Sequence, residues 1–166
     1  MTTYRLFLAA VFLVSLTYGF TIGAGVQLYD VLEEDRAFSV YADASVPILP
    51  ILHWRQGIFN LDLPSDGMNL SLGTGLSSDL LFFIPADIPV TPYVVTGLWT
   101  YLNDAGIELD LRIGLGGQTD IGPVFGYLEL GTDFSLIKPD DGDTRTDYPL
   151  FVRAGIRRPL KFKIKR

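Results

Sequence analysis

The chain has 166 residues, of which 48% are hydrophobic, with a net charge of −6 and no cysteine. This length suits one domain. The lack of cysteine excludes disulfides and thiolate metal sites, and the acidic balance argues against a nucleic-acid partner, which requires a basic surface. Only 19% of the residues are charged, fewer than the roughly 25% of soluble domains. Abundant glycine and aromatic residues favour an all-β chain.

The N-terminus is predicted to be a secretory signal peptide. Arg5 precedes the apolar run LFLAAVFLVSL, residues 6–16. A basic residue before about 7–15 apolar residues is typical of such a peptide, and the run is too short to cross a bilayer as a helix. We expect cleavage after Gly19, which makes 1–19 the signal peptide and 20–166 the mature domain. A buried hydrophobic strand or helix is the alternative for the same run.

Apolar and polar residues alternate along the mature chain with a period of two, which is the pattern of β-strands. In the third strand Leu52 and Trp54 are out of phase with Phe59, which predicts a β-bulge near Gln56-Gly57. The fourth strand begins at Met68 and is expected to continue towards Ile84. Eight strands are predicted, over about 20–29, 38–46, 51–63, 68–84, 89–101, 106–116, 122–136 and from 148 onward.

The pattern does not say which face of each strand is the inside, and the sixth strand, GIELDLRIGLG over 106–116, is the clearest example. Its odd-numbered residues are Ile or Leu, and Glu108, Asp110 and Arg112 lie between them. In a soluble protein the apolar face would form the core. In an outer-membrane barrel the apolar face would meet lipid and the charges would fill the interior.

The connections between strands sort into two kinds. The first, third, fifth and seventh are polar, and the second, fourth and sixth are short and compact. In a membrane barrel with both termini in the periplasm, odd connections face outside and even ones are periplasmic turns. The odd connections are 30–37, 64–67, 102–106 and 138–149, and the even ones are 47–50, 85–89 and 118–122.

With these features the chain resembles the small eight-stranded outer-membrane β-barrel proteins, of the type of the OmpA transmembrane domain and OmpX. The resemblance covers about 20–165 and rests on the signal peptide, eight amphipathic strands and alternating connections, without a diagnostic motif. It implies an antiparallel up-and-down transmembrane β-barrel in the outer membrane of a diderm bacterium. It also implies a monomer that contacts outer-membrane lipid and is inserted by the barrel-assembly machinery.

Two features near the C-terminus depart from that pattern. Such barrels usually end on an aromatic residue, whereas this chain ends on Arg166. In addition, Arg158 falls in phase with the lipid-facing Ile156 and Leu160. Either Pro159 introduces a bulge there or Arg158 lies at the level of the lipid headgroups, where a charge costs about 0–1 kcal/mol rather than the 2–4 kcal/mol of the midplane.

If the apolar faces meet lipid, the interior holds a set of charged side chains. Opposite charges on adjacent strands can pair there, and eight strands enclose a lumen only wide enough for side chains. We therefore expect a salt-bridged plug, and a narrow ion-conducting pore is an alternative. The predicted cluster is Asp43, Glu108, Asp110, Arg112, Glu129, Asp133, Arg153 and Arg157, and Gln27, Asn60, Asp62 and Asn69 are expected to share the same interior.

Other chemistry is weakly supported. The acidic loop with Asp140, Asp141, Asp143 and Asp147 is a candidate Ca²⁺ site, but it lacks the EF-hand spacing and is better explained as a solvated loop. We expect no enzymatic activity and no cofactor, because the only histidine, His53, follows a periplasmic turn and no catalytic motif is present.

The main alternative is a secreted, soluble, lipocalin-like barrel whose leucine faces line a cavity for a small apolar ligand. Two features favour the membrane barrel. Glycine is frequent on the polar faces, where it makes room for charged neighbours in a narrow barrel. Aromatic residues lie towards strand ends, which is typical of interface girdles; the residues so assigned are Trp99, Tyr101, Tyr148 and Phe151.

Overall fold

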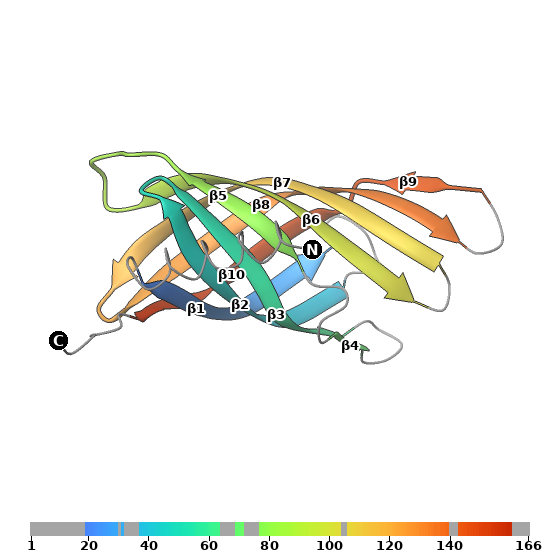
Figure 1. The fold of residues 1–166 in the computed structure, drawn as a ribbon, viewed down its shortest axis with the longest axis horizontal. Helices are drawn as coiled ribbons and strands as arrows, with labels where there is room; N and C mark the ends of the chain where they lie inside the picture. Colours follow the sequence, from blue (N-terminus) through green and yellow to red (C-terminus); the bar gives the residue numbers. More distant parts are fainter. Residues whose placement is uncertain are drawn as a thin grey trace, which may run out of the picture.

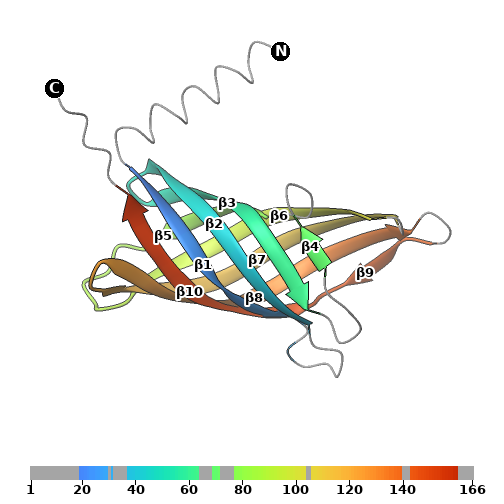
Figure 2. The same cartoon turned by 90° about the horizontal axis from the view of Figure 1, so that it is seen from below.

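The protein is a closed, all-β barrel in the computed structural model (Figures 1 and 2). The structure describes residues 19–29, 31, 37–63, 69–71, 77–103, 106–139 and 143–160. The strands are β1 (Phe20–Tyr29), β2 (Ala37–Leu49), β3 (Leu52–Leu63), β4 (Asn69–Ser71), β5 (Ser78–Phe83), β6 (Thr91–Asn103), β7 (Gly106–Ile121), β8 (Val124–Pro139), β9 (Arg145–Asp147) and β10 (Leu150–Leu160).

Eight of these strands close the barrel in the order β1–β2–β3–β5–β6–β7–β8–β10. Every neighbouring pair is antiparallel, and the first and last strands pair with each other from Phe20↔Leu160 to Tyr29↔Phe151. Pairing of the first strand with the last closes the sheet on itself. The predicted eight-stranded antiparallel barrel is therefore confirmed.

The two ends of the barrel differ. At one end, here called the turn end, lie the β2–β3 turn at Pro50-Ile51 and the β7–β8 turn at Gly122-Pro123, and there β1 begins and β10 ends. At the opposite loop end, β4 pairs with the last residues of β3 and β9 pairs with β8. These two short strands extend the wall beyond the closed barrel (Figure 1).

Side-chain alternation on β7 answers the question that GIELDLRIGLG raised. Leu111 and Leu115 are 50% and 60% exposed, whereas Asp110 and Arg112 are 5% and 1% exposed. The leucine face therefore lies on the outside of the barrel and the charges lie inside. The same orientation holds on β1, where Gln27 is buried and Val26 and Leu28 are exposed.

The predicted β-bulge lies on β3. Asp43 of β2 pairs with Gly57 while Ala42 pairs with Phe59, so Ile58 is the additional residue. This insertion brings both Ile58 and Phe59 to the outer side and reverses the phase of the strand. It explains how Trp54 and Phe59 both point outward although their separation in sequence is odd.

Several predicted boundaries were wrong because strands continue through polar or proline-containing segments. β2 extends through Pro47 to Leu49, and β7 extends through the QTDIG segment to Ile121. The sharp β7–β8 turn then uses Gly122, whose φ of +64° is in the left-handed region that favours glycine. The seventh connection contains β9, which the sequence pattern did not predict.

The outward-facing Arg158 keeps regular pairing. It pairs with Ile22, and Pro159 pairs with Thr21, without a shift in register. The bulge considered at Pro159 is therefore absent, and Arg158 lies two residues from the end of β10 at the turn end. Among the described residues there is no helix long and apolar enough to span a membrane.

Candidate functional site

The centre of the lumen is organised around Glu129 of β8. Its Oε1 accepts hydrogen bonds from Arg55 Nη1 at 2.6 Å, from Tyr93 Oη at 2.7 Å and from Arg157 Nη2 at 2.9 Å. Arg55 Nη2 donates to the other carboxylate oxygen at 3.1 Å. Glu129 is completely buried, so these bonds replace the water that its charge loses.

Arg55 connects opposite walls of the barrel. Three strands lie between β3 and β8 in either direction around the closed sheet, so the contact between Arg55 and Glu129 spans the lumen. The Nε of Arg55 also donates to Asp79 Oδ2 of the neighbouring β5 at 2.8 Å. One guanidinium thereby joins two buried carboxylates.

Arg153 of β10 completes this central network. Its Nη1 lies 3.5 Å from Asp79 Oδ2 and 3.7 Å from Glu129 Oε2. Its Nε donates to Gln27 Oε1 at 2.7 Å, and its guanidinium lies 4.5 Å from the centre of the Tyr41 ring. Because β5 and β10 are also opposite one another, a second ion pair crosses the lumen.

Nearer the loop end, Arg112 and Asp133 form a separate pair. Arg112 Nε and Nη2 donate to the two oxygens of Asp133 at 2.8 and 2.6 Å. These residues face each other on adjacent strands, as expected for cross-strand pairing of opposite charges. Trp99 and Phe151 flank the guanidinium at 4.9 and 4.3 Å, in cation–π contact.

Towards the turn end, aromatic residues close the lumen around Arg157. Its guanidinium lies 3.7 Å from the centre of the Tyr127 ring, and the Tyr127 hydroxyl makes a short hydrogen bond with that of Tyr41. Phe83 packs on Tyr93 with ring centres 5.0 Å apart. This end is therefore filled by rings as well as by ion pairs.

Three buried carboxylates of the described lumen are incompletely paired. Neither oxygen of Asp43 has a hydrogen-bond partner, and the same holds for Oδ1 of Asp79 and Oδ1 of Asp110. Asp43 borders a small cavity of about 10 Å³, which Asn60 and Arg153 also line. That volume is about enough for one water molecule, so this cavity is not a passage.

Lumen glycines provide the space that these large side chains occupy. A Cβ on Gly97 would lie 2.1 Å from Asp79 Oδ1, and one on Gly116 would lie 2.4 Å from the Tyr93 ring. A Cβ on Gly23 would lie 2.6 Å from Asp43 Oδ1. Glycine on the polar faces therefore makes room for charged and aromatic neighbours.

The structure brings together most of the cluster predicted from sequence. The interior contains Asp43, Asp110, Arg112, Glu129, Asp133, Arg153 and Arg157, all buried. The side chains of Glu108 and Asn69 lie outside the described ones, while Asn60 is buried and Asp62 is partly buried. Asp62 Oδ1 accepts a hydrogen bond from Ser39 Oγ at 2.5 Å.

Sequence reasoning missed Arg55 and Asp79, which are completely buried and belong to the central network. The signal was present in the alternation. Once Trp54 is assigned to the outside, Arg55 must face inward, and Leu80 and Phe82 place Asp79 inside in the same way. The phase change at the bulge obscured the first residue, and the uncertain course of the fourth strand obscured the second.

The aromatic girdle assignment was wrong for two residues. Trp99 and Phe151 are 3% and 1% exposed and lie in the lumen beside Arg112. Tyr148 is exposed, and the side chain of Tyr101 lies outside the described ones. The position of an aromatic residue along its strand did not reveal whether its side chain points into the lumen or outward. That orientation is set by the phase of the alternation.

Only part of the acidic loop lies among the residues that the structure describes. Asp143 and Asp147 are exposed, and Asp140 and Asp141 lie outside the described residues. No group of three metal-ligating side chains occurs among the residues that are described. His53 is partly buried at the turn end, with its ring 4.7 Å from that of Phe83.

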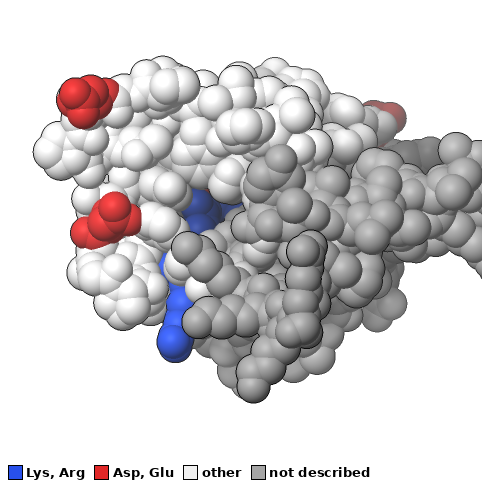
Figure 3. All heavy atoms as spheres, turned by 60° about the vertical axis from the view of Figure 1, so that its left-hand side comes forward, with Lys and Arg blue, Asp and Glu red and all other residues white. Residues whose placement is uncertain are grey.

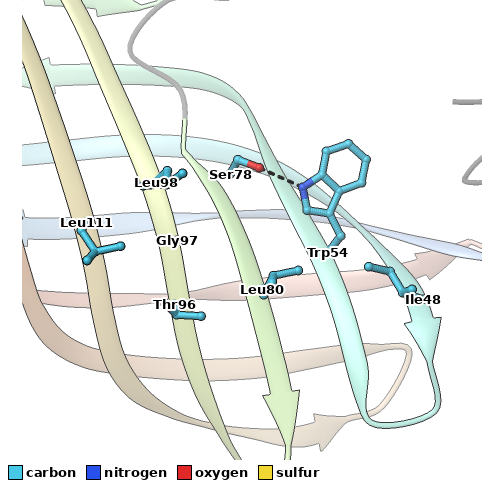
Figure 4. A pocket seen from close by; sticks show the side chains of 8 residues that line it. All are labelled: Ile48, Trp54, Ser78, Leu80, Thr96, Gly97, Leu98 and Leu111. Carbon is cyan, nitrogen blue, oxygen red and sulfur yellow. Dashed lines mark hydrogen bonds between the residues drawn. The ribbon is translucent and has the colours of Figure 1, made fainter. Parts of the chain in front are cut away.

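Outside, the barrel carries apolar hollows between its strands. One of about 420 Å³ lies over β3, β5 and β6, where Trp54 Nε1 donates to Ser78 Oγ at 2.9 Å (Figure 4). Viewed towards the turn end, the described surface is mainly uncharged, with Lys or Arg atoms within a recess (Figure 3). Among the described residues, buried charges line the lumen.

Comparisons with known proteins give limited information. No protein-family model matches the chain, and no curated protein matches it. A solved structure of a major outer membrane protein from Thermus thermophilus is 17% identical, with a TM-score of 0.47 over 86% of this chain and 100% of that chain. The function must therefore be inferred from the barrel itself.

Proposed function

We propose that the protein is a small β-barrel of the outer membrane of a diderm bacterium, exported by its N-terminal signal peptide. It acts as a monomer with a structural role in membrane integrity or in surface interactions, and it is inserted by the barrel-assembly machinery. Its lumen is a charged plug that holds the walls together. No catalytic step and no cofactor belong to this proposal.

One observation carries the proposal: large apolar side chains are exposed on the outside of all eight strands that close the barrel. Examples from opposite walls are Val26 on β1 and Leu98 on β6, at 41% and 52% exposed. Soluble monomers rarely expose contiguous apolar patches beyond a few hundred Å². A surrounding hydrocarbon layer supplies the apolar contacts that water cannot.

The lipocalin-like alternative requires the opposite orientation. Its apolar ligand would need a lumen lined by the leucine faces, whereas Leu111 and Leu130 point outward and Arg112 and Glu129 point inward. A soluble barrel of this orientation would bury charges and expose its leucines. We therefore favour the membrane barrel.

The pore alternative is disfavoured by the two ion pairs that cross the lumen. Arg55 with Glu129 and Arg153 with Asp79 join opposite walls at the centre. An ion moving along the axis would have to separate these buried ion pairs, and the pair of Arg55 and Glu129 is joined by charge-assisted hydrogen bonds, which are among the strongest in proteins. This geometry supports a closed plug.

The proposal is tested by cell fractionation combined with heat-modifiability on SDS gels. We expect the protein in the outer-membrane fraction, extracted only by detergent, with a folded band that changes mobility after boiling. Closed membrane barrels resist SDS at room temperature because every backbone group of the wall is paired. Recovery in the soluble periplasm without detergent would overturn the proposal.

A further inference from the structure

We infer that the outer wall at the turn end carries a binding site for one anionic glycerophospholipid, with the phosphate at Arg158 and an acyl chain in the groove beside it. This inference rests on the proposed membrane location. The groove has a volume of about 690 Å³ and lies over β7, β8 and β10. That volume is within the range of ligand pockets, about 300–1,000 Å³.

The groove is apolar, and small residues form its floor between larger ones. Gly126 and Ala154 provide little side chain, whereas the larger Leu115, Leu130 and Ile156 stand beside them. Gly126 pairs with Ile156 and Ala154 pairs with Leu128, so the small and large residues alternate across two adjacent strands. An unfilled hollow forfeits dispersion contacts along its lining, and a flexible hydrocarbon chain can fill one of irregular shape.

Arg158 supplies a positive charge just beyond this groove, since it follows the lining residue Ile156 by two positions on β10. It is exposed on the same outer face of β10 as Ile156, two residues further along, which is about 6.6 Å in a strand. It forms no ion pair with any residue in the described part of the chain. A long arginine side chain reaches an interfacial phosphate and binds it in a bidentate manner.

The order of these groups matches the orientation of a lipid. The groove runs from Leu115 and Leu130, in the middle of their strands, to Ile121 at the β7–β8 turn. Thr119, with its hydroxyl donating to Pro89 O at 2.9 Å, and then Arg158 follow at the turn end. Apolar lining towards the barrel centre and a cation at the rim fit a phospholipid of the adjoining leaflet.

The test is a lipid titration of the protein recovered from membranes in a non-ionic detergent, followed by native mass spectrometry. The probes are dioleoylphosphatidylglycerol, which is anionic, and dioleoylphosphatidylcholine, which is zwitterionic. We expect one phosphatidylglycerol to bind before any other lipid. Replacement Arg158→Gln should weaken this binding about fivefold, since one arginine at an anionic surface contributes about 1 kcal/mol, and Arg158→Lys should retain most of it.

A groove variant separates the acyl-chain contribution from the charge. Ala154→Phe fills the floor from the outside and should weaken both lipids. The matched controls are Arg145→Gln, an exposed arginine at the loop end, and Ala44→Phe, an outward alanine on β2; both should bind as the original protein does. Equal binding of the two lipids, or unchanged phosphatidylglycerol binding by Arg158→Gln, would overturn the inference.

Failure of the underlying proposal gives a different result. Insertion into pure phosphatidylcholine vesicles, read by heat-modifiability, requires the membrane barrel but not the anionic site. A protein that inserts there without preferring phosphatidylglycerol contradicts the lipid site alone. A protein that does not insert contradicts the membrane location and, with it, the inference that rests on it.

Discussion

Arg55 and Glu129 face each other from opposite walls of the barrel and meet in two hydrogen bonds, of 2.6 and 3.1 Å. β3 and β8 share no backbone pairing, so this contact and its neighbours hold the two walls at a fixed distance. Removing one partner of a buried pair leaves an uncompensated charge, which costs more than the pair itself contributes. The stability of the barrel should therefore depend strongly on individual lumen residues.

Glu129→Gln tests that dependence. The change keeps the shape but removes the charge that faces Arg55, Arg153 and Arg157. We expect the free energy of unfolding to fall by about 3–5 kcal/mol, measured by urea unfolding in phosphatidylcholine vesicles. The control Asp147→Asn, on the exposed β9, should change it by less than about 0.5 kcal/mol. Equal loss in both variants would contradict a central role for Glu129.

The pair of Arg112 and Asp133 allows a double-mutant cycle. Arg112→Met and Asp133→Leu each leave one buried charge without its bidentate partner, so each should lower the free energy of unfolding by about 3–5 kcal/mol. Because the double variant leaves neither charge, its loss of stability should be smaller than the sum of the two single losses by about 0.5–3 kcal/mol. Additive losses would show that the two side chains act independently.

Conductance in planar bilayers tests the closed plug. We expect the original protein to show no discrete openings, because buried ion pairs cross the lumen at its centre. Openings that disappear when Arg112 or Arg153 is replaced would support the ion-conducting alternative. Openings that appear only after Glu129 is replaced would instead support a plug that this residue keeps closed.

Much of the fold was predictable because a membrane-type barrel repeats one simple pattern. In GIELDLRIGLG every second residue is apolar, and that period alone fixes which residues share a face. The bulge at Ile58 was also visible, since Trp54 and Phe59 must reverse phase between them. Strand ends were less predictable, because pairing with a long neighbour extends β2 through Pro47 and β7 through Gln118.

The sequence predicted which residues face the lumen, but it did not predict which residues they contact there. Sequence alternation placed Glu129 and Arg153 inside, and Arg112 with Asp133 was accessible as a pair on adjacent strands. Nothing local indicates that Glu129 meets Arg55, because strands four places apart around the barrel come together only when it closes. Cross-lumen contacts depend on the tilt and stagger of all eight strands, which single-strand patterns do not contain.

Gly97→Ala tests the requirement for small residues in the lumen. The new Cβ would lie 2.1 Å from Asp79 Oδ1 and 2.9 Å from the backbone oxygen of Ser78. Overpacking of this kind costs about 1–3 kcal/mol, and it would also displace Asp79 from Arg55. Urea unfolding should show this loss, whereas Thr96→Ala, its outward neighbour on β6, should be nearly neutral. A stable Gly97→Ala variant would mean that the lumen has more room than its packing indicates.

Ile113→Arg distinguishes a lipid-facing wall from a water-facing one. Ile113 lies in the middle of β7 and is 58% exposed on the outer surface. In a bilayer an arginine at the midplane costs about 2–4 kcal/mol, whereas one near the interface costs about 0–1 kcal/mol. Ile121→Arg, also outward but at the end of the same strand, is therefore the matched control.

The stability of the two variants should differ if lipid surrounds the barrel, and it should be the same if the outer wall faces water. Folding into phosphatidylcholine vesicles should be impaired by Ile113→Arg and nearly unchanged by Ile121→Arg, with stability measured by urea unfolding. If the outer wall faced water, both changes would place a charge on a solvated surface, and both would leave stability within about 0.5 kcal/mol of the original. Equal, small effects would thus contradict the membrane location, while a midplane-specific loss requires hydrocarbon around the centre of the barrel.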